Sequence, residues 1–344
     1  MSPPAHSPID VTVIIVNYRS AQLTIEGLAS LQSERADAAL CIRAIVVDNA
    51  SGDAAALERA IAERGWGGWV ELLVAPRNGG FAYGNNRGIE RAYARAAPDY
   101  FYLLNPDAQV RPGAIRALVE FLNAHPAAGI AGGRFENADG SDWPFAFRFP
   151  TLQSEFLQGL QLSVLYRLMR RWEVPRQMDA TREQAVDWVS GAAMLIRPAV
   201  LEAIGGFDEQ YFLYFEETDF CRRARQARFE TWYVPASRVM HLGGGVTEIE
   251  RVPALKRLPG YWFESRRRYF VMSFGPTRAM LIDAIALAAS ALGVLQRTLR
   301  RRRHRNVPHF TRDLARSSIL WRRNRSLPAP RCFAPRLPAR AASA

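Results

Sequence analysis

The chain has 344 residues, of which 49% are hydrophobic, with three cysteines and a formal net charge of +12. This composition allows a large buried core and excludes a disordered chain, and three widely spaced cysteines exclude a disulfide framework. Residues 256–344 carry 20 Lys and Arg against three acids, so residues 1–255 carry 25 against 30. The basic end suits anionic lipid or nucleic acid, whereas the acidic body argues against a nucleic-acid reader.

Apolar runs typical of buried strands alternate with helical segments in the first third of the chain. The start lacks a charged segment followed by an apolar one, which predicts a cytosolic protein rather than a secreted one. Alternation at this spacing predicts an α/β fold with a doubly wound, mostly parallel sheet and helices on both faces. We expect strands at 11–16, 42–47, 69–74 and 101–104, and helices at 20–31, at 53–64 and at 112–123; the glycine-rich segment 78–88 is expected to lead into a further helix that ends near Ala97.

The pattern is less regular beyond residue 134. Residues 134–184 hold several prolines and no clear period, which predicts a variable insertion near a binding site. Regularity returns in a strand at 186–196 that Gly191 interrupts, and a helix at 216–227 follows. After a strand at 231–234, His241 precedes three glycines, which predicts a loop carrying a single imidazole. The main domain is expected to end near residue 255.

The last ninety residues indicate helices beside a membrane. Residues 262–274 form a basic aromatic helix, and residues 279–295 are apolar nearly all round but fall short of the roughly 20 residues that span a bilayer. An arginine run from 297 to 305 follows, which is typical of a segment lying in a cytoplasmic membrane interface. A core helix with a solvated tail is the alternative for 256–325, and 326–344, rich in proline, is expected to be disordered.

Polar residues end three of the expected strands. They are Asn17-Tyr18, Asp48-Asn49 and Asn105-Pro106-Asp107, and the carboxyl ends of such strands form the ligand crevice of open α/β sheets. An Asp after the second strand can accept the imide N–H of uracil or thymine, and Asp107 can hold Mg²⁺ or Mn²⁺ on a diphosphate. Taken alone, each of these segments could equally be an ordinary turn at the end of a strand. Together they predict a nucleoside-diphosphate site.

The sequence resembles inverting glycosyltransferases of family 2, with the GT-A fold, over roughly residues 10–270. Within this family it most resembles bacterial rhamnosyltransferases that use a dTDP-sugar and a polyprenyl-linked acceptor. The matching pieces, in chain order, are Val13-Ile-Ile-Val-Asn-Tyr18, Val46-Val-Asp-Asn-Ala-Ser51, Asn78-Gly-Gly-Phe-Ala82 with Asn85, Asn86 and Gly88, Leu104-Asn-Pro-Asp-Ala108, Trp188-Val-Ser-Gly191, Gly205-Gly-Phe-Asp-Glu209 and Tyr214-Phe-Glu-Glu-Thr-Asp219.

The resemblance implies roles for individual residues. Asp107 would bind the metal ion, although Asn105 departs from the usual Asp-x-Asp, and His241 would serve the metal or the diphosphate; a lone loop histidine is otherwise often a surface residue. The residues implied in substrate binding are Asn17, Tyr18, Asp48 on the nucleobase, Asn78, Gly79 and Gly80 near the donor, Asn85, Asn105, Trp188, Gly191, Glu216 and Asp219.

Glu217 is the expected catalytic base. The family uses an Asp at this position, so Glu217 is one methylene longer, and the acids at 216–219 could instead only stabilise a helix N-terminus. Inversion needs a carboxylate on the acceptor side to take the hydroxyl proton. Asp219 would point elsewhere and be structural or acceptor-binding.

The sequence therefore predicts an inverting glycosyltransferase, peripheral on the inner face of a cell membrane, in cell-envelope glycan synthesis. It would move a sugar, with dTDP-rhamnose the expected donor, to a polyprenyl-linked or glycan acceptor, and it would bind an anionic membrane surface but no nucleic acid. The alternatives are a soluble transferase using UDP-hexose or a galactofuranose donor, a degenerate sugar-nucleotide-binding protein, and a nucleic-acid-binding protein suggested only by the arginine-rich tail.

Overall fold

A mixed, mostly parallel sheet forms the centre of the molecule. The computed structural model describes residues 7–137, 139–143, 146–160, 162–175, 179–241, 257–299, 307–322 and 327–335. Within them the main sheet has the order β3-β2-β1-β4-β11-β6-β12-β5. The strands that build it are β1 (Ile9–Asn17), β2 (Leu40–Asp48), β3 (Val70–Val74), β4 (Tyr100–Leu104), β5 (Ala108–Val110), β6 (Ala128–Glu136), β11 (Ala193–Ile196) and β12 (Glu230–His241).

The first four strands are parallel, as their sequence predicts. Val11 to Ile15 of β1 are almost fully buried, because β1 lies between β2 and β4 with helices over both faces. Strand β11 runs antiparallel to its neighbours β4 and β6, and β12 runs parallel to β6. The helices of this half are α1 (Ala21–Ser30), α2 (Gln32–Arg35), α3 (Ala54–Glu63), α4 (Gly80–Arg95), α5 (Ala114–Ala124), α8 (Pro198–Ile204) and α9 (Glu216–Gln226). The expected doubly wound α/β architecture is confirmed.

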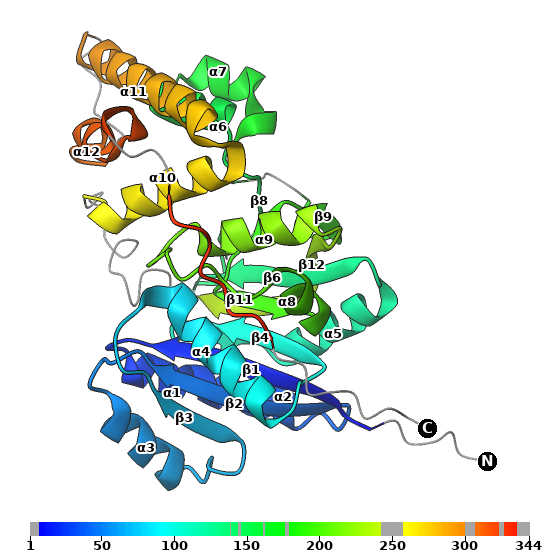
Figure 1. The fold of residues 1–344 in the computed structure, drawn as a ribbon. Coiled ribbons are helices and arrows are strands. Elements are labelled where there is room, and N and C mark those ends of the chain that lie inside the picture. Colours follow the sequence, from blue (N-terminus) through cyan, green and yellow to red (C-terminus); the bar gives the residue numbers. More distant parts are fainter. Residues whose placement is uncertain are drawn as a thin grey trace, which may run out of the picture.

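A helical module stands at one end of the sheet domain (Figure 1). It consists of α6 (Leu152–Leu160), α7 (Ser163–Leu168), α10 (Gly260–Phe274), α11 (Pro276–Leu299) and α12 (Phe310–Ser317), with short 3₁₀ helices at Arg170–Trp172 and Ile319–Trp321. Four small strands lie in the chain before and after α6 and α7. Of these, β7 (Asp142–Trp143) and β9 (Gln184–Val186) pair with β6 and β12 of the main sheet, and β8 (Ala146–Phe147) and β10 (Trp188–Val189) form a separate two-stranded sheet. Residues 134–184 therefore supply two helices of this module, where the sequence predicts an irregular insertion.

A buried ion triad locks the module together. Arg266 of α10 donates to Glu155 of α6 at 2.6 Å and to Asp283 of α11 at 2.6 Å. All three side chains are less than 10% exposed, and the second oxygen of Asp283 accepts from Ser318 and from the backbone of Ile319. Removing one partner of such a buried pair leaves an uncompensated charge and is strongly destabilising.

Three predictions at the C-terminal side need correction. Helix α11 spans 24 residues, longer than the apolar run suggests, because its polar ends continue the helix. His241 ends strand β12, paired with Ala108 of β5, rather than lying in a loop; residues 242–245 lie outside the described part. Residues 327–335, expected to be disordered, pack on the sheet domain, where the Phe333 carbonyl accepts from Gly206 and its ring lies 5.9 Å from Tyr93. Residues 336–344 lie outside the description.

Candidate functional site

The predicted strand tips meet at one edge of the sheet. Asn17 and Asp48 end β1 and β2 and are Cα partners across the ladder, and β4 on the other side of β1 ends just before Asn105. Parallel neighbouring strands present their carboxyl ends on the same edge, which is where such sheets bind ligands. Tyr18 follows β1 at this edge and is partly exposed.

Asp48 is first of all the anchor of a buried polar network. The Asn17 amide donates to Asp48 at 2.9 Å and to Asp53 at 3.0 Å, and Ser51 donates its hydroxyl to Asp48. Asp53 in turn accepts from the backbone N–H groups of Ser20 and Ala21, which begin α1. The network fixes the loop after β2, and a role of Asp48 toward a nucleobase stays a prediction.

Asn49 links this loop to the glycine turn before α4. Its amide nitrogen donates to Asn78 at 3.1 Å and to the Gly80 carbonyl at 3.0 Å. Gly80 has φ +84°, and a Cβ there would lie 1.8 Å from the Phe212 carbonyl oxygen, so only glycine fits. That carbonyl also accepts the Phe81 N–H at 2.9 Å. The turn is thereby fixed against the segment that leads to Glu217. The sequence places Asn49 at the second strand tip but gives it no role of its own, and the structure shows that it joins this tip to the glycine turn.

Two of the predicted polar residues on α4 act within the protein. Asn85 is buried and donates to the Phe81 carbonyl at 3.0 Å, one turn earlier in the helix. Asn86 donates to the Phe207 carbonyl at 2.8 Å and accepts from the Phe207 N–H at 2.9 Å. Asn86 therefore joins α4 to the turn that precedes α9, and Asn85 supports the helix that carries the glycine turn.

Asp107 and His241 face each other at the end of the sheet. The imidazole Nε2 lies 3.3 Å from Asp107 Oδ1, and both side chains are less than 10% exposed. Antiparallel pairing of Ala108 with His241 explains why two residues 134 positions apart meet. A carboxylate beside an imidazole suits Mn²⁺, and the carboxylate alone suits Mg²⁺. The described residues hold no group of three or more acidic, histidine or cysteine side chains for a metal.

Glu217 sits on the first turn of α9, behind an unusual backbone turn. Tyr214 and Phe215 both have positive φ, 70° and 67°, and sparsely populated backbone of this kind concentrates at functional sites. The Glu217 Oε2 atom is buried and hydrogen-bonds to no atom of the described chain. Burial raises the pKa of Glu217 to about 7, although the backbone N–H groups of Gly191 and Thr218 favour its ionised form. A carboxylate of this pKa can accept a proton near neutral pH.

The neighbouring acids differ from Glu217. Glu216 is 3% exposed, and its pKa lies well above the usual range because it is buried and stands beside the charge of Glu217. Asp219 is buried in ion pairs with Arg223 at 2.7 Å and Arg222 at 3.3 Å. Arg223 also donates to the carbonyls of Ile204 and Gly206. Asp219 therefore holds α9 to the preceding turn, which agrees with the structural role considered for it.

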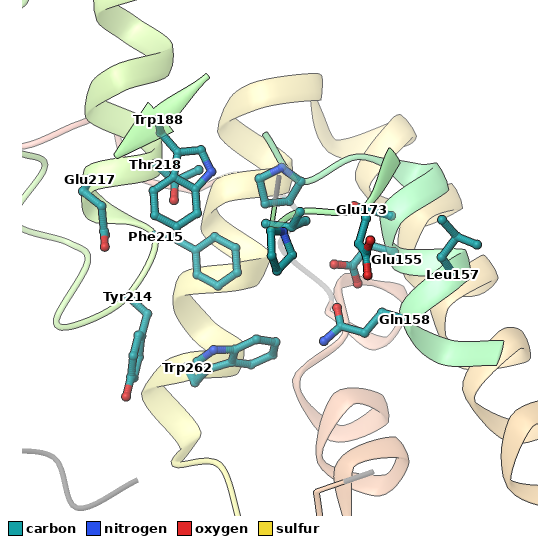
Figure 2. A pocket seen from close by; sticks show the side chains of 14 residues that line it. Glu155, Leu157, Gln158, Glu173, Trp188, Tyr214, Phe215, Glu217, Thr218 and Trp262 are labelled. Carbon is teal, nitrogen blue, oxygen red and sulfur yellow. The ribbon is translucent and has the colours of Figure 1, made fainter. Parts of the chain in front are cut away.

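An aromatic cavity of about 450 Å³ opens beside Glu217 (Figure 2). Trp188 lines it and is fixed by stacking on Phe147 at 4.2 Å and by donating its indole N–H to the Arg148 carbonyl at 2.9 Å. Trp262 of α10 lines the other side and packs on Phe215 at 5.6 Å. Most of the lining surface is apolar, as in small-molecule sites, and the polar side chains in it are Ser154, Glu155, Gln158, Glu173, Tyr214, Glu217 and Thr218. We call this space the aromatic cavity.

The helical module forms half of this cavity. Residues of α6, the segment 173–175 and Trp262 all line it, and α6 belongs to the stretch whose pattern could not be assigned from sequence. Aromatic residues in α10 are a weak signal, because the same pattern fits a core helix. Sequence reasoning therefore missed Trp262 and Gln158.

Gly191 and Ala192 connect the strand edge near Asp107 to Glu217. The Ala192 carbonyl accepts the Asn105 N–H at 2.9 Å, and a Cβ on Gly191 would lie 3.7 Å from the Glu217 Cβ and 3.0 Å from the Phe81 ring. Other chain segments therefore approach Gly191 closely, as the sequence predicts. Asn105, Gly191 and Glu217 form one continuous rim from the strand edge to the aromatic cavity.

A sequence model described as "Glycosyltransferase like family 2" matches residues 8–258. The chain belongs to this family. It is 33% identical over 183 residues to the N-acetylglucosaminyl-diphospho-decaprenol L-rhamnosyltransferase of Mycobacterium tuberculosis, a match covering 50% of this chain and 58% of that protein. It is 28% identical over 169 residues to the rhamnosyltransferase WbbL of Escherichia coli, covering 47% and 61%. These matches span about 60% of the relatives.

Solved structures support the fold assignment. The crystal structure of GalNAc-T7 with UDP, GalNAc and Mn²⁺ matches with a TM-score of 0.58 and 13% identity, covering 92% of this chain and 56% of that chain. At this identity the likeness shows the fold alone. The GT-A fold expected from the sequence resemblance is confirmed for this family 2 chain.

Proposed function

We propose that the protein is an inverting glycosyltransferase that moves a sugar, with rhamnose the favoured one, from a nucleoside-diphosphate donor to a lipid-linked or glycan acceptor. The observation that carries the proposal is the Glu217 carboxylate, which has a buried, unbonded oxygen and a raised pKa and lines an aromatic cavity. The named activities of the family 2 relatives support the choice of rhamnose and of a lipid-linked acceptor.

The proposed reaction is a single displacement. The acceptor hydroxyl gives its proton to Glu217 while its oxygen bonds to the anomeric carbon, and the bond from that carbon to the diphosphate oxygen breaks with its electrons. Attack from the side opposite the leaving group inverts the anomeric centre. The diphosphate then leaves as a nucleoside diphosphate, and the proton remains on Glu217 until it passes to solvent.

Asp107 and His241 would hold a divalent cation together with the donor diphosphate. Such an ion would neutralise the negative charge that develops on the leaving group. The two side chains suit this task because they are buried, adjacent and fixed by the pairing of β5 with β12. The Gly79-Gly80 turn would let the backbone lie close to the same donor, while its own N–H groups donate to the side chains of Asn49 and Asn78.

The aromatic cavity would receive the acceptor sugar. Trp188 and Trp262 offer flat apolar surfaces to the C–H faces of a pyranose ring, and Gln158 and Glu173 can hydrogen-bond its hydroxyls. Both indoles are fixed by their own neighbours, so little side-chain freedom is lost on binding. This geometry directs one acceptor hydroxyl toward Glu217.

Helix α11 would attach the protein to the cytoplasmic membrane face by one side only. Within the described residues it is the helix long and apolar enough to cross a membrane, a test that core helices also pass. Leu281, Leu292 and Leu295 are each more than half exposed, whereas Asp283 on the other side is buried against Arg266. A helix with a buried ion pair on one side and exposed leucines on the other suits an interfacial position.

A donor screen tests the proposed function. Thermal unfolding of the full chain is followed with dTDP-rhamnose, other dTDP-sugars, UDP-hexoses and UDP-galactofuranose, with and without Mn²⁺. We expect dTDP-rhamnose with Mn²⁺ to raise the unfolding temperature most. A larger effect of a UDP-sugar would replace the donor assignment, and no effect of any nucleotide sugar would reject the donor site itself.

A further inference from the structure

A second cavity, of about 650 Å³, has four arginine side chains among the residues that line it. It lies between α9, the C-terminal end of α10 and the segments 148–151 and 171–172. Its lining contains one carboxylate, Asp187, and four guanidinium groups, which gives a formal net charge of +3; the four are Arg148, Arg171, Arg222 and Arg225. We call it the arginine cavity. A concave surface of one charge sign concentrates ions of the opposite sign.

The carboxylates within reach neutralise only half of these groups. Arg225 pairs with Asp187 at 2.7 Å, and Asp187 also accepts the Phe149 N–H. Arg222 pairs with Asp219 at 3.3 Å, yet its Nε is buried and donates to no atom of the described residues.

Arg148 and Arg171 lack a carboxylate partner in the described part of the chain. Arg148 donates to the Glu173 carbonyl at 3.4 Å, and Arg171 lies 4.0 Å from the ring centroid of Trp172. Neither contact neutralises a positive charge. These two guanidinium groups therefore keep donors and charge for a ligand.

The arginine cavity shares its walls with the aromatic cavity. Phe149 and Thr151 line the arginine cavity, whereas Pro150 between them lines the aromatic cavity. Likewise Asp187 lines the arginine cavity and its neighbour Trp188 lines the aromatic cavity. The hydrogen bond from Arg148 to the Glu173 carbonyl crosses the same partition. An anion in the arginine cavity would therefore lie only one layer of residues from the proposed acceptor sugar.

We propose that the arginine cavity is a binding site for a phosphate or diphosphate ester. Guanidinium groups bind phosphate oxygens through paired N–H donors, and several around one cavity favour a multiply charged anion. The phosphate could come from the diphosphate of a lipid-linked acceptor or from a phospholipid headgroup. The shared walls favour the acceptor. The choice of the acceptor as the source of the phosphate rests on the proposed function, whereas the existence of the anion site does not.

Calorimetric titration with inorganic pyrophosphate, on the full chain and without divalent metal, tests the site. We expect R148Q/R171Q to bind pyrophosphate at least about tenfold more weakly than wild type, a loss of about 1.4 kcal/mol. The control R59Q/R64Q removes two positive charges from exposed helix α3 and its end, and it should bind as wild type does. Equal binding by both double variants, or no binding by wild type, would overturn the proposal.

A second variant and a second readout separate loss of the ligand from loss of the fold. R148K/R171K keeps both charges but loses the paired donor geometry, so its affinity should fall between wild type and R148Q/R171Q. All variants should keep the wild-type unfolding temperature within a few degrees. If R148Q/R171Q unfolds early and the Lys variant binds no better, the arginines support the fold and the proposal fails.

Two further comparisons identify the source of the phosphate. If it belongs to the acceptor, R148Q/R171Q raises KM for a sugar diphosphate lipid but not for the same sugar as an alkyl glycoside. If it belongs to a headgroup, the variant instead loses flotation with phosphatidylglycerol vesicles and keeps it with phosphatidylcholine. Weaker pyrophosphate binding by R148Q/R171Q would support the anion site even if no sugar transfer were detected. Failure of the proposed function and failure of this site are therefore distinguishable.

Discussion

Replacing Glu217 by Gln should slow sugar transfer strongly without disturbing donor binding. Gln keeps the size and most hydrogen bonds of the side chain but cannot accept the acceptor proton. Loss of a general base costs about 10²–10⁴ in rate. Because Glu217 lines the aromatic cavity rather than the strand edge, we expect the donor KM and the affinity for Mn²⁺ to stay near wild type.

The pH profile of transfer gives the same prediction a second readout. The pKa of Glu217 is raised by burial to about 7, so the ionised, proton-accepting form is lost below that pH. The wild-type kcat/KM should therefore rise about tenfold per pH unit up to about pH 6.5 and level off above about pH 7.5. The residual activity of Glu217→Gln should lack this rise.

The same shift predicts how stability depends on pH. A carboxyl whose pKa is raised in the folded protein binds more protons folded than unfolded between pH 4.5 and 7, so the free energy of unfolding falls as pH rises through this window. Glu217→Gln should reduce that fall. Urea unfolding at pH 5 and pH 8 measures it, and an unchanged pH dependence in the variant would show that Glu217 does not titrate as described.

Steady-state transfer assays with both substrates varied decide the prediction. Glu216→Gln is the matched control, because it changes a neighbouring buried Glu and should leave transfer within about tenfold. Glu217→Asp restores the residue usual in the family but moves the carboxylate back by about 1.5 Å, which should lower kcat if the cavity is adapted to Glu. Near-normal kcat in Glu217→Gln together with a large loss in Glu216→Gln would refute the assignment of the base.

Four other changes are predicted. Asp107→Ala should abolish metal-dependent transfer, measured with Mn²⁺ titration; activity within about tenfold of wild type, a loss of only about 1.4 kcal/mol, would contradict a metal role. Trp188→Ala should raise the acceptor KM about tenfold and leave the donor KM unchanged, and the opposite pattern would move the acceptor elsewhere. Gly80→Ala should lower the free energy of unfolding by about 1–3 kcal/mol, because its Cβ meets the Phe212 carbonyl; unchanged stability in urea would show that the turn adapts. Leu292→Asp should reduce vesicle flotation while Val74→Asp, at an exposed position on β3, should not; equal flotation of both would exclude α11 as the anchor.

The sequence predicts the sheet half of the molecule well, for a physical reason. Strand β4, most of β1 and the second half of β2 are apolar runs because both faces of a central parallel strand are covered, and polar residues follow where each strand leaves the core. Two residues of the candidate site, Asp48 and Asp107, can be predicted in the same way, because they lie at strand ends. A local pattern is sufficient to find them.

The sequence predicts helices α10 and α11 of the helical module, but not α6, α7 or the packing of these helices, because long-range pairs build the module. Glu155 and Arg266 are 111 residues apart, and neither α6 nor α11 shows why its charged residue is buried until both are packed on α10. His241 joins Asp107 through strand pairing rather than through a recognisable loop pattern. The aromatic cavity depends on this packing, so Trp262 and Gln158 could not be assigned from sequence.

The most direct test of the central claim is the anomeric configuration of the transferred sugar. Purified protein, Mn²⁺, dTDP-rhamnose and a lipid-linked acceptor are incubated, and the product is examined by NMR. We predict a new glycosidic bond whose anomeric configuration is opposite to that in the donor, formed by wild type and about 10²–10⁴ times more slowly by Glu217→Gln. A product that retains the donor configuration, or nucleotide release without any transfer, would contradict the displacement by an acceptor hydroxyl that Glu217 deprotonates.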